Sequence, residues 1–196
     1  EVTKPIPGKA GSVFLIFFFF FLGIPHPGSQ GAGAGEPLKI GIIEEPKTLN
    51  VWRATDAWSN KVLNQIYHPL YIREPESLKL IPWLAEGDPE YDERALAYTI
   101  KLRKAKWSDG SDFTAEDVAF TADVIQTLNI PRKSSNWKYV KTVEVLDKDR
   151  IRFVLERPEA LFLPRTLTTP IVQKRQWEGV VSEARRSDNP LNRLSV

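Results

Sequence analysis

The sequence predicts a mixed α/β fold, and three local patterns support this prediction. Residues 96–102 alternate apolar and polar side chains, which is typical of a half-buried strand. Residues 114–128 place apolar side chains on one broad arc of a helix. Residues 143–145 and 151–155 alternate again on either side of a polar turn at 147–150, which predicts a β-hairpin.

Composition restricts the classes of function that the chain can serve. Its 196 residues are enough for one ordinary domain or slightly more. The 27 basic and 25 acidic residues leave a net charge of +2, so charge gives no case for nucleic-acid binding. The sequence contains no Cys, which excludes disulfides, thiolate metal sites and a Cys nucleophile within it.

Residues 1–34 have the pattern of a signal peptide. Lys4 and Lys9 precede an apolar run at 13–22, and the small residues at 32–34 offer a cleavage site after Ala34. The run would span only about 15 Å as a helix, which is too short to cross a bilayer. The alternative is a buried or interfacial hydrophobic helix. We expect export, which would place the mature protein in the periplasm or outside the cell.

The predicted mature chain opens with a strand and a helix. Every second residue of 38–43 is apolar apart from the final Ile pair, which predicts a strand. A polar turn interrupted by Pro follows at 44–50. Asp56 then provides an N-cap for a helix predicted at 57–67.

The central helix has a clear start. Asp109 and Gly110 predict a turn, because Gly tolerates positive φ angles. Thr114 is a suitable N-cap, and Asp117 three residues later completes a capping-box pattern. The apolar arc of the helix spans roughly 200°, more than a surface helix needs. We therefore expect it to pack between two neighbours.

Less regular structure is predicted beyond that helix. Residues 130–136 have the composition of a loop, and Phe162 opens a short helical piece after the hairpin. No stretch of the sequence repeats another, so a solenoid or propeller is not supported.

The sequence carries few residues that could perform chemistry. His68 is the only His of the predicted mature chain, and it lacks a second ligand or a nucleophile at a suitable spacing. Carboxylate pairs such as Glu116 and Asp117 are explained by capping and turns. The basic residues at 101–106 are interpreted as a solvated strand face. We expect no catalytic site, no metal and no cofactor.

A longer run of residues resembles a known family. Residues 102–121 read LRKAKWSDGSDFTAEDVAFT. This run resembles the signature region of the family 5 extracellular solute-binding proteins, the peptide- and nickel-binding receptors of ABC importers. In that family, a strand ending in Leu-Arg leads into a turn and helix with the pattern W/F-x-D-G-x-x-F/L-T-A-x-D-V. The resemblance covers 36–196, with departures at Val51, Pro69 and Gln173, where Pro, Gly and Pro are usual. It also implies that residues 169–174 form a return strand.

The resemblance implies a periplasmic-binding-protein fold of type II. Such proteins have two α/β lobes joined by a hinge, with a β-rich α+β domain inserted after the first strand. On this scheme, residues 35–49 form the first strand of lobe I, residues 50–164 the inserted domain, and residues 165–196 a truncated return to lobe I. The second lobe would be absent, and the chain, which contains no Met, is expected to be an N-terminal fragment.

The resemblance also implies a function. Family members capture an oligopeptide or another small solute between the lobes and deliver it to a membrane permease of an ABC importer. Four residues are expected to bind the ligand: Glu45, Lys47, Thr48 and Trp52. We expect a monomer with no nucleic-acid partner and no enzymatic activity.

Other interpretations of the sequence remain open. Glu45, Lys47 and Thr48 could be ordinary solvated turn residues. Residues 89–155 could form a stand-alone β-rich interaction module, the fragment could lack function, and a hydrolase that depends on His68 is a further alternative. We also expect that the chain alone binds no solute tightly and exposes apolar surface where a second lobe would pack.

Overall fold

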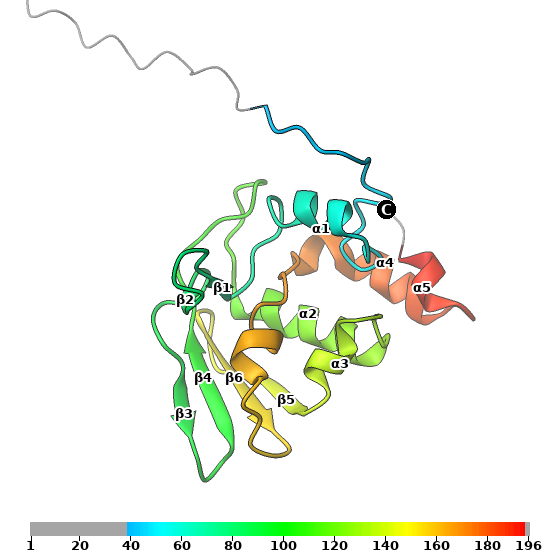
Figure 1. The fold of residues 1–196 in the computed structure, drawn as a ribbon. Helices are drawn as coiled ribbons and strands as arrows, with labels where there is room; N and C mark the ends of the chain where they lie inside the picture. The colour runs from blue at the N-terminus through cyan, green and yellow to red at the C-terminus, as the bar shows by residue number, and fades with distance from the viewer. Residues whose placement is uncertain (1–38, 195–196) are drawn as a thin grey trace, which may run out of the picture. The chain divides into compact units, whose positions relative to one another are not determined.

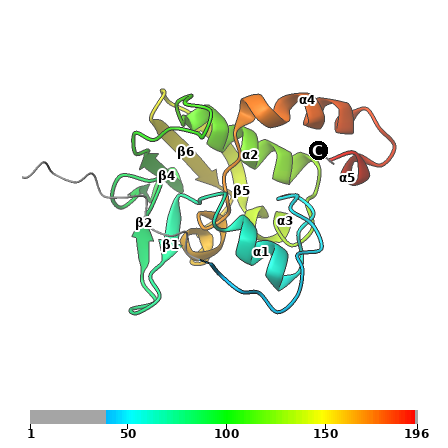
Figure 2. The ribbon, with the colours of Figure 1, turned by 90° about the horizontal axis from the view of Figure 1, so that it is seen from above.

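The computed structural model describes residues 39–194. The chain divides into two units at the boundary between Gly41 and Ile42, and almost all described residues belong to the second. That unit has a mixed α/β fold, in which helix α2 (Ala115–Thr127) lies between a β-sheet and helix α4 (Lys174–Arg185), as Figures 1 and 2 show. The predicted fold class is therefore confirmed at this level.

The sheet has four antiparallel strands in the order β3-β4-β6-β5. Their bounds are Glu90–Asp92 for β3, Ala97–Lys101 for β4, Val140–Val145 for β5 and Arg150–Leu155 for β6. Strand β4 and the β5–β6 hairpin are the strand and hairpin that the alternating pattern predicts. A separate two-stranded sheet pairs β1 (Tyr71–Arg73) with β2 (Leu80–Pro82).

Four short helical elements complete the unit. They are α1 (Ala57–Leu63), α3 (Ser134–Trp137), α5 (Pro190–Arg193) and the π-helix η1 (Phe162–Thr166). Asp56 caps α1 as predicted, because its Oδ1 accepts a hydrogen bond from Ser59 N at 2.8 Å. The helix ends at Leu63 rather than continuing to residue 67, and Ile66 lies in a turn with 54% of its surface exposed. The predicted length of this helix is therefore wrong.

Helix α2 forms where the capping residues predict it. Thr114 N donates to the carboxylate of Asp117 at 3.0 Å, which is the side-chain half of a capping box. Val118, Val124 and Ile125 are fully buried. The helix contacts β5 and β6 on one side and α3 and α4 on others, so the expectation of two neighbours is confirmed.

One hydrophobic core runs through the second unit. It includes Trp52, Phe153 and Phe162 together with Val172 and Trp177, which lie beyond residue 165. The domain boundaries expected at 49/50 and 164/165 therefore do not coincide with a break in this core, and they stay predictions. The predicted signal peptide at 1–34 lies outside the described residues. Within 39–194, no helix is both long enough and apolar enough to cross a membrane.

Two predicted strands are not formed. Residues 39–43 have no strand pairing, and Ile43 is 89% exposed. The predicted strand at 169–174 is replaced by an irregular segment leading into α4. There, Ile171 N donates to His68 O at 3.0 Å and Val172 N to Thr121 Oγ1 at 3.1 Å. A strand requires a neighbouring strand to receive its hydrogen bonds, and an alternating pattern does not supply that neighbour.

Candidate functional site

The predicted ligand-binding residues all belong to the loop before α1. Glu45 and Lys47 are exposed, and Thr48 is half-buried. Thr48 N donates to Ser59 Oγ at 3.1 Å, and its hydroxyl accepts from Asn50 N at 3.1 Å. Glu45 and Lys47 are therefore accessible to a ligand, whereas the hydroxyl of Thr48 stabilises the local turn.

Trp52 lies in the core instead. Its side chain is 2% exposed and contacts Trp177 edge-to-face, with the ring centroids 5.7 Å apart. Such aromatic pairs contribute packing energy beyond the area they bury. The structure thus separates Trp52 from the exposed Glu45 and Lys47, and burial indicates a packing role for it. Its role as a ligand contact stays a prediction that this packing does not favour.

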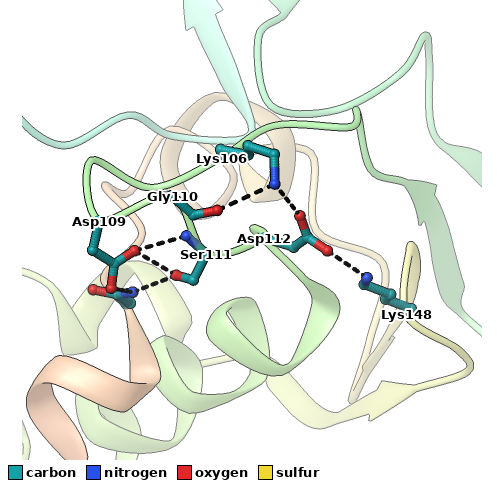
Figure 3. Close-up of polar contacts among 7 residues, drawn as sticks. Lys106, Asp109, Gly110, Ser111, Asp112 and Lys148 are labelled. Atoms are coloured by element: carbon teal, nitrogen blue, oxygen red, sulfur yellow. Dashed lines mark hydrogen bonds and ion pairs between the residues drawn. The ribbon is translucent and has the colours of Figure 1, made fainter.

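The turn and helix start at residues 107–117, called here the signature turn, form a dense polar network. Gly110 has a φ of +82°, which a residue with a side chain would adopt only with strain. Asp109 accepts hydrogen bonds from Ser111 N at 2.9 Å, from Ser111 Oγ at 2.6 Å and from Gln173 Nε2 at 2.9 Å (Figure 3). These bonds, those of Ser111 first, lower the pKa of Asp109 from its ordinary 3.8 to about 2.

A second carboxylate of the turn holds two cations. Asp112 accepts from Lys106 Nζ at 2.9 Å through one oxygen and from Lys148 Nζ at 2.6 Å through the other, as Figure 3 shows. Lys148 and then Lys106 lower the pKa of Asp112 to about 2. Because all three side chains are substantially exposed, the pairs join the signature turn to the β5–β6 turn with modest energy.

Asp117 joins two helices and is the most buried carboxylate of the turn. It is 6% exposed. Its carboxylate accepts a hydrogen bond from Thr114 N at the start of α2. It also accepts hydrogen bonds from Trp107 Nε1 at 3.2 Å and from Lys174 N at 2.8 Å. Lys174 is the first residue of α4, so one carboxylate satisfies backbone donors at the N-termini of both α2 and α4. The sequence predicts only the first of these two contacts.

A further contact, not predicted from the sequence, joins two loops. Arg132 Nη1 donates to Thr55 O at 2.6 Å across 77 residues. Arg132 has a φ of +63° and Asn129 a φ of +48°, conformations that non-Gly residues adopt only rarely. The only local signal was the predicted loop at 130–136, which does not reveal the partner.

His68 has no catalytic or metal-binding partner among the described residues. It is exposed, and its ring centroid lies 5.7 Å from that of Trp83. Within 39–194, no group of three or more His, Asp or Glu side chains is arranged to hold a metal ion. The signature turn is therefore explained by hydrogen bonds that hold α2 and α4, and it presents no reactive group.

Comparison with known proteins agrees with the resemblance seen in the signature turn. Residues 79–191, more than half of the chain, match the family described as bacterial extracellular solute-binding proteins, family 5 Middle. The oligopeptide-binding protein AppA of Bacillus subtilis (strain 168) is 30% identical over an alignment of 172 residues, and the match covers 84% of this chain and 31% of that protein. The chain thus spans under a third of the length of this curated relative.

Solved structures give the same fold. The structure of AppA from Bacillus subtilis in complex with a nonapeptide matches with a TM-score of 0.65 at 30% identity, over 71% of this chain and 28% of that one. NikZ from Campylobacter jejuni, in complex with Ni(L-His), matches with a TM-score of 0.61 at 25% identity, over 76% of this chain and 28% of that one. The chain belongs to family 5 of the bacterial extracellular solute-binding proteins, with the fold of part of a type II periplasmic binding protein.

Proposed function

We propose that this chain contributes to an extracytoplasmic receptor of an ABC importer, which captures peptides and delivers them to a membrane permease. The observation that carries this proposal is the family membership of residues 79–191. The likeness to AppA, whose structure was solved in complex with a nonapeptide, makes peptides the first ligand class to test. The same membership favours a binding protein over an enzyme.

The proposed mechanism requires two lobes that close over the solute. Residues 35–49 would begin lobe I, residues 50–164 would form the inserted domain and residues 165–196 would return to lobe I. Closure shifts a population between open and closed forms, so affinity depends on contacts that both lobes make. The chain spans only 31% of AppA, so on this proposal it supplies one side of the ligand cleft.

Within this side of the cleft, Glu45 and Lys47 are the proposed ligand contacts. Both side chains are exposed, and no ion pair occupies either of them among residues 39–194. A peptide carries an ammonium group and a carboxylate at its ends, which these two charges could bind. Recognition outside the cytoplasmic membrane also fits the predicted signal peptide at 1–34, and the permease would be the protein partner.

A melting-temperature screen tests the proposal. The 196-residue chain and the product of the complete reading frame that contains it are each titrated with nonapeptides, Ni(L-His) and oligosaccharides. A ligand at about 100 times its dissociation constant stabilises a receptor by about 2.7 kcal/mol. We expect peptides to raise the melting temperature of the complete product and to leave the 196-residue chain almost unchanged.

Variants of the complete product locate the site. Lys47→Gln is expected to weaken peptide binding by roughly tenfold, because a charge-assisted hydrogen bond contributes about 1.5–3 kcal/mol. Lys39→Gln removes the same charge from a neighbouring position and serves as the matched control. If none of the three ligand classes raises the melting temperature, the proposed receptor function is contradicted. If Ni(L-His) alone raises it, the ligand is a nickel complex rather than a peptide.

A further inference from the structure

Three short segments, two of them close in sequence and the third far along the chain, line a partly open pocket of about 720 Å³. Its walls are residues 103–106, the end of the signature turn at 112–113, and the β5–β6 turn at 147–149. This volume lies within the range of roughly 300–1,000 Å³ that is typical of sites for small molecules. The proposed contacts Glu45 and Lys47 do not line this pocket.

The walls are held together by the backbone. Three hydrogen bonds join them: Phe113 N to Ala105 O at 3.0 Å, Ala115 N to Lys148 O at 3.0 Å, and Leu102 N to Asp149 O at 2.7 Å. The first bond joins two of the walls directly. The other two bonds link residues next to those walls to the third wall, the β5–β6 turn. Because these backbone hydrogen bonds already hold the three segments in place, a ligand would not have to order them on binding.

The pocket combines an apolar floor with charged walls. Phe113 is 7% exposed and its ring contacts Trp107 edge-to-face at 6.0 Å, so its position is fixed. Ala105 also lines the floor and is half-buried. Its side chain is a single methyl group, so it fills little of the pocket. A smaller pocket of about 150 Å³ shares Ala105, Lys106 and Phe113 and adds Ile66 and other residues.

Charge around the floor is unevenly paired. Lys106 and Lys148 are both bound to Asp112 (Figure 3), and Asp147 is bound to Arg150 Nε at 2.6 Å. Among residues 39–194, by contrast, Arg103 and Lys104 make no ion pair, and both are exposed. The remaining lining carboxylate, that of Asp149, offsets one of these two positive charges.

We propose that this pocket is a binding site for a small organic anion with an apolar body, such as an aryl-alkyl carboxylate. The apolar body would contact Phe113 and Ala105, and the carboxylate would bind Arg103 and Lys104. This site differs from the solute contacts proposed above, because neither Glu45 nor Lys47 lines it.

NMR titration of the complete 196-residue chain tests the site. The probe is 3-phenylpropionate, and its uncharged counterpart is 3-phenylpropanamide. We expect saturable shifts confined to the amides of 103–106, 112–113 and 147–149, with roughly millimolar affinity for so small a probe. The amide should bind about tenfold more weakly, and added salt should weaken only the carboxylate.

Two variants and a control assign the contacts. The double variant Arg103→Gln, Lys104→Gln should weaken the carboxylate about tenfold and leave the amide unchanged. Ala105→Phe should abolish binding of both probes by filling the floor. The control Lys79→Gln, Arg94→Gln removes the same charge from exposed cations that make no ion pair, and it should bind as the unaltered chain does.

The proposal has clear contrary outcomes. Shifts that do not saturate, or that centre on residues outside the three walls, would show that the pocket is not a site. Equal affinity for the carboxylate and the amide would show that Arg103 and Lys104 do not select an anion. If Ala105→Phe disturbs the spectrum of the whole unit, the charge variant, which changes exposed side chains only, decides the result.

Discussion

The signature turn at 107–117 and the loop at 42–49 differ in how many hydrogen bonds and ion pairs their polar groups make and in how exposed their apolar side chains are. In the turn, Asp109, Asp112 and Asp117 each accept several hydrogen bonds or ion pairs, some from residues more than 30 positions away. In the loop, Ile42 and Ile43 are exposed and Glu45 has no charged partner within 39–194. The residues of the family signature therefore hold the fold, whereas the proposed solute contacts Glu45 and Lys47 lie in a segment with little structure of its own.

Trp52 offers the largest test of this comparison, because it is where the loop enters the core. Trp52→Ala should destabilise the protein by about 3–5 kcal/mol in urea unfolding, the range for removing a buried aromatic side chain. Trp83→Ala, at a Trp with 40% of its surface exposed, is the control and should cost well under half as much. A loss below about 1 kcal/mol for Trp52→Ala would instead make Trp52 a surface residue free to contact ligand.

Asp117 tests the signature turn itself. Asp117→Ala leaves Trp107 Nε1, Thr114 N and Lys174 N without their acceptor, and each buried unsatisfied donor costs about 1–3 kcal/mol. We expect a total loss of about 3 kcal/mol in the free energy of unfolding, since water reaches some of these groups. Glu116→Ala, next to it but exposed and bound only to Lys174 Nζ, should cost under about 1 kcal/mol. Equal losses for the two variants would contradict the role assigned to Asp117.

Acid should remove the stability that two carboxylates of the turn contribute. The folded pKa values of Asp109 and Asp112 are about 2, below their ordinary value of 3.8. Their contribution to stability is therefore complete above pH 4 and is lost as the pH falls from about 4 to about 2. Urea unfolding measured between pH 5 and pH 2 should show this decline. The double variant Asp109→Asn, Asp112→Asn should have a flatter profile, and an unchanged profile would show that these carboxylates are not linked to folding.

The smallest effect is expected in the loop. Ile43→Thr should change the free energy of unfolding by less than about 0.5 kcal/mol, because the side chain is 89% exposed. Val118→Thr in α2 provides the buried counterpart and should be clearly destabilising, since it places a hydroxyl in the core. If Ile43→Thr were equally costly, residues 42–49 would be part of a packed structure.

Local patterns predicted the elements that depend mainly on neighbouring residues. Thr114 and Asp117 start a helix through contacts three residues apart, and the turn at 147–149 joins strands that follow each other in sequence. The strand at 38–43 and the strand at 169–174 failed for the opposite reason, since a strand is stable only beside a partner. Strands β1 to β3 were not predicted, because each is only three residues long. Helix α4 was not predicted either, although Trp177, Val181 and Ala184 lie at helical spacing and form its buried face.

The sequence by itself determined the family, the central helix and the hairpin, because each is encoded in a continuous run of residues. Only the tertiary structure decided that Asp117 also begins α4, that Gln173 bonds Asp109, and that Trp52 is buried while Lys47 is exposed. The pocket at 103–149 likewise depends on three segments meeting in space. Such contacts depend on where the chain brings distant residues together, and no spacing within one segment encodes that.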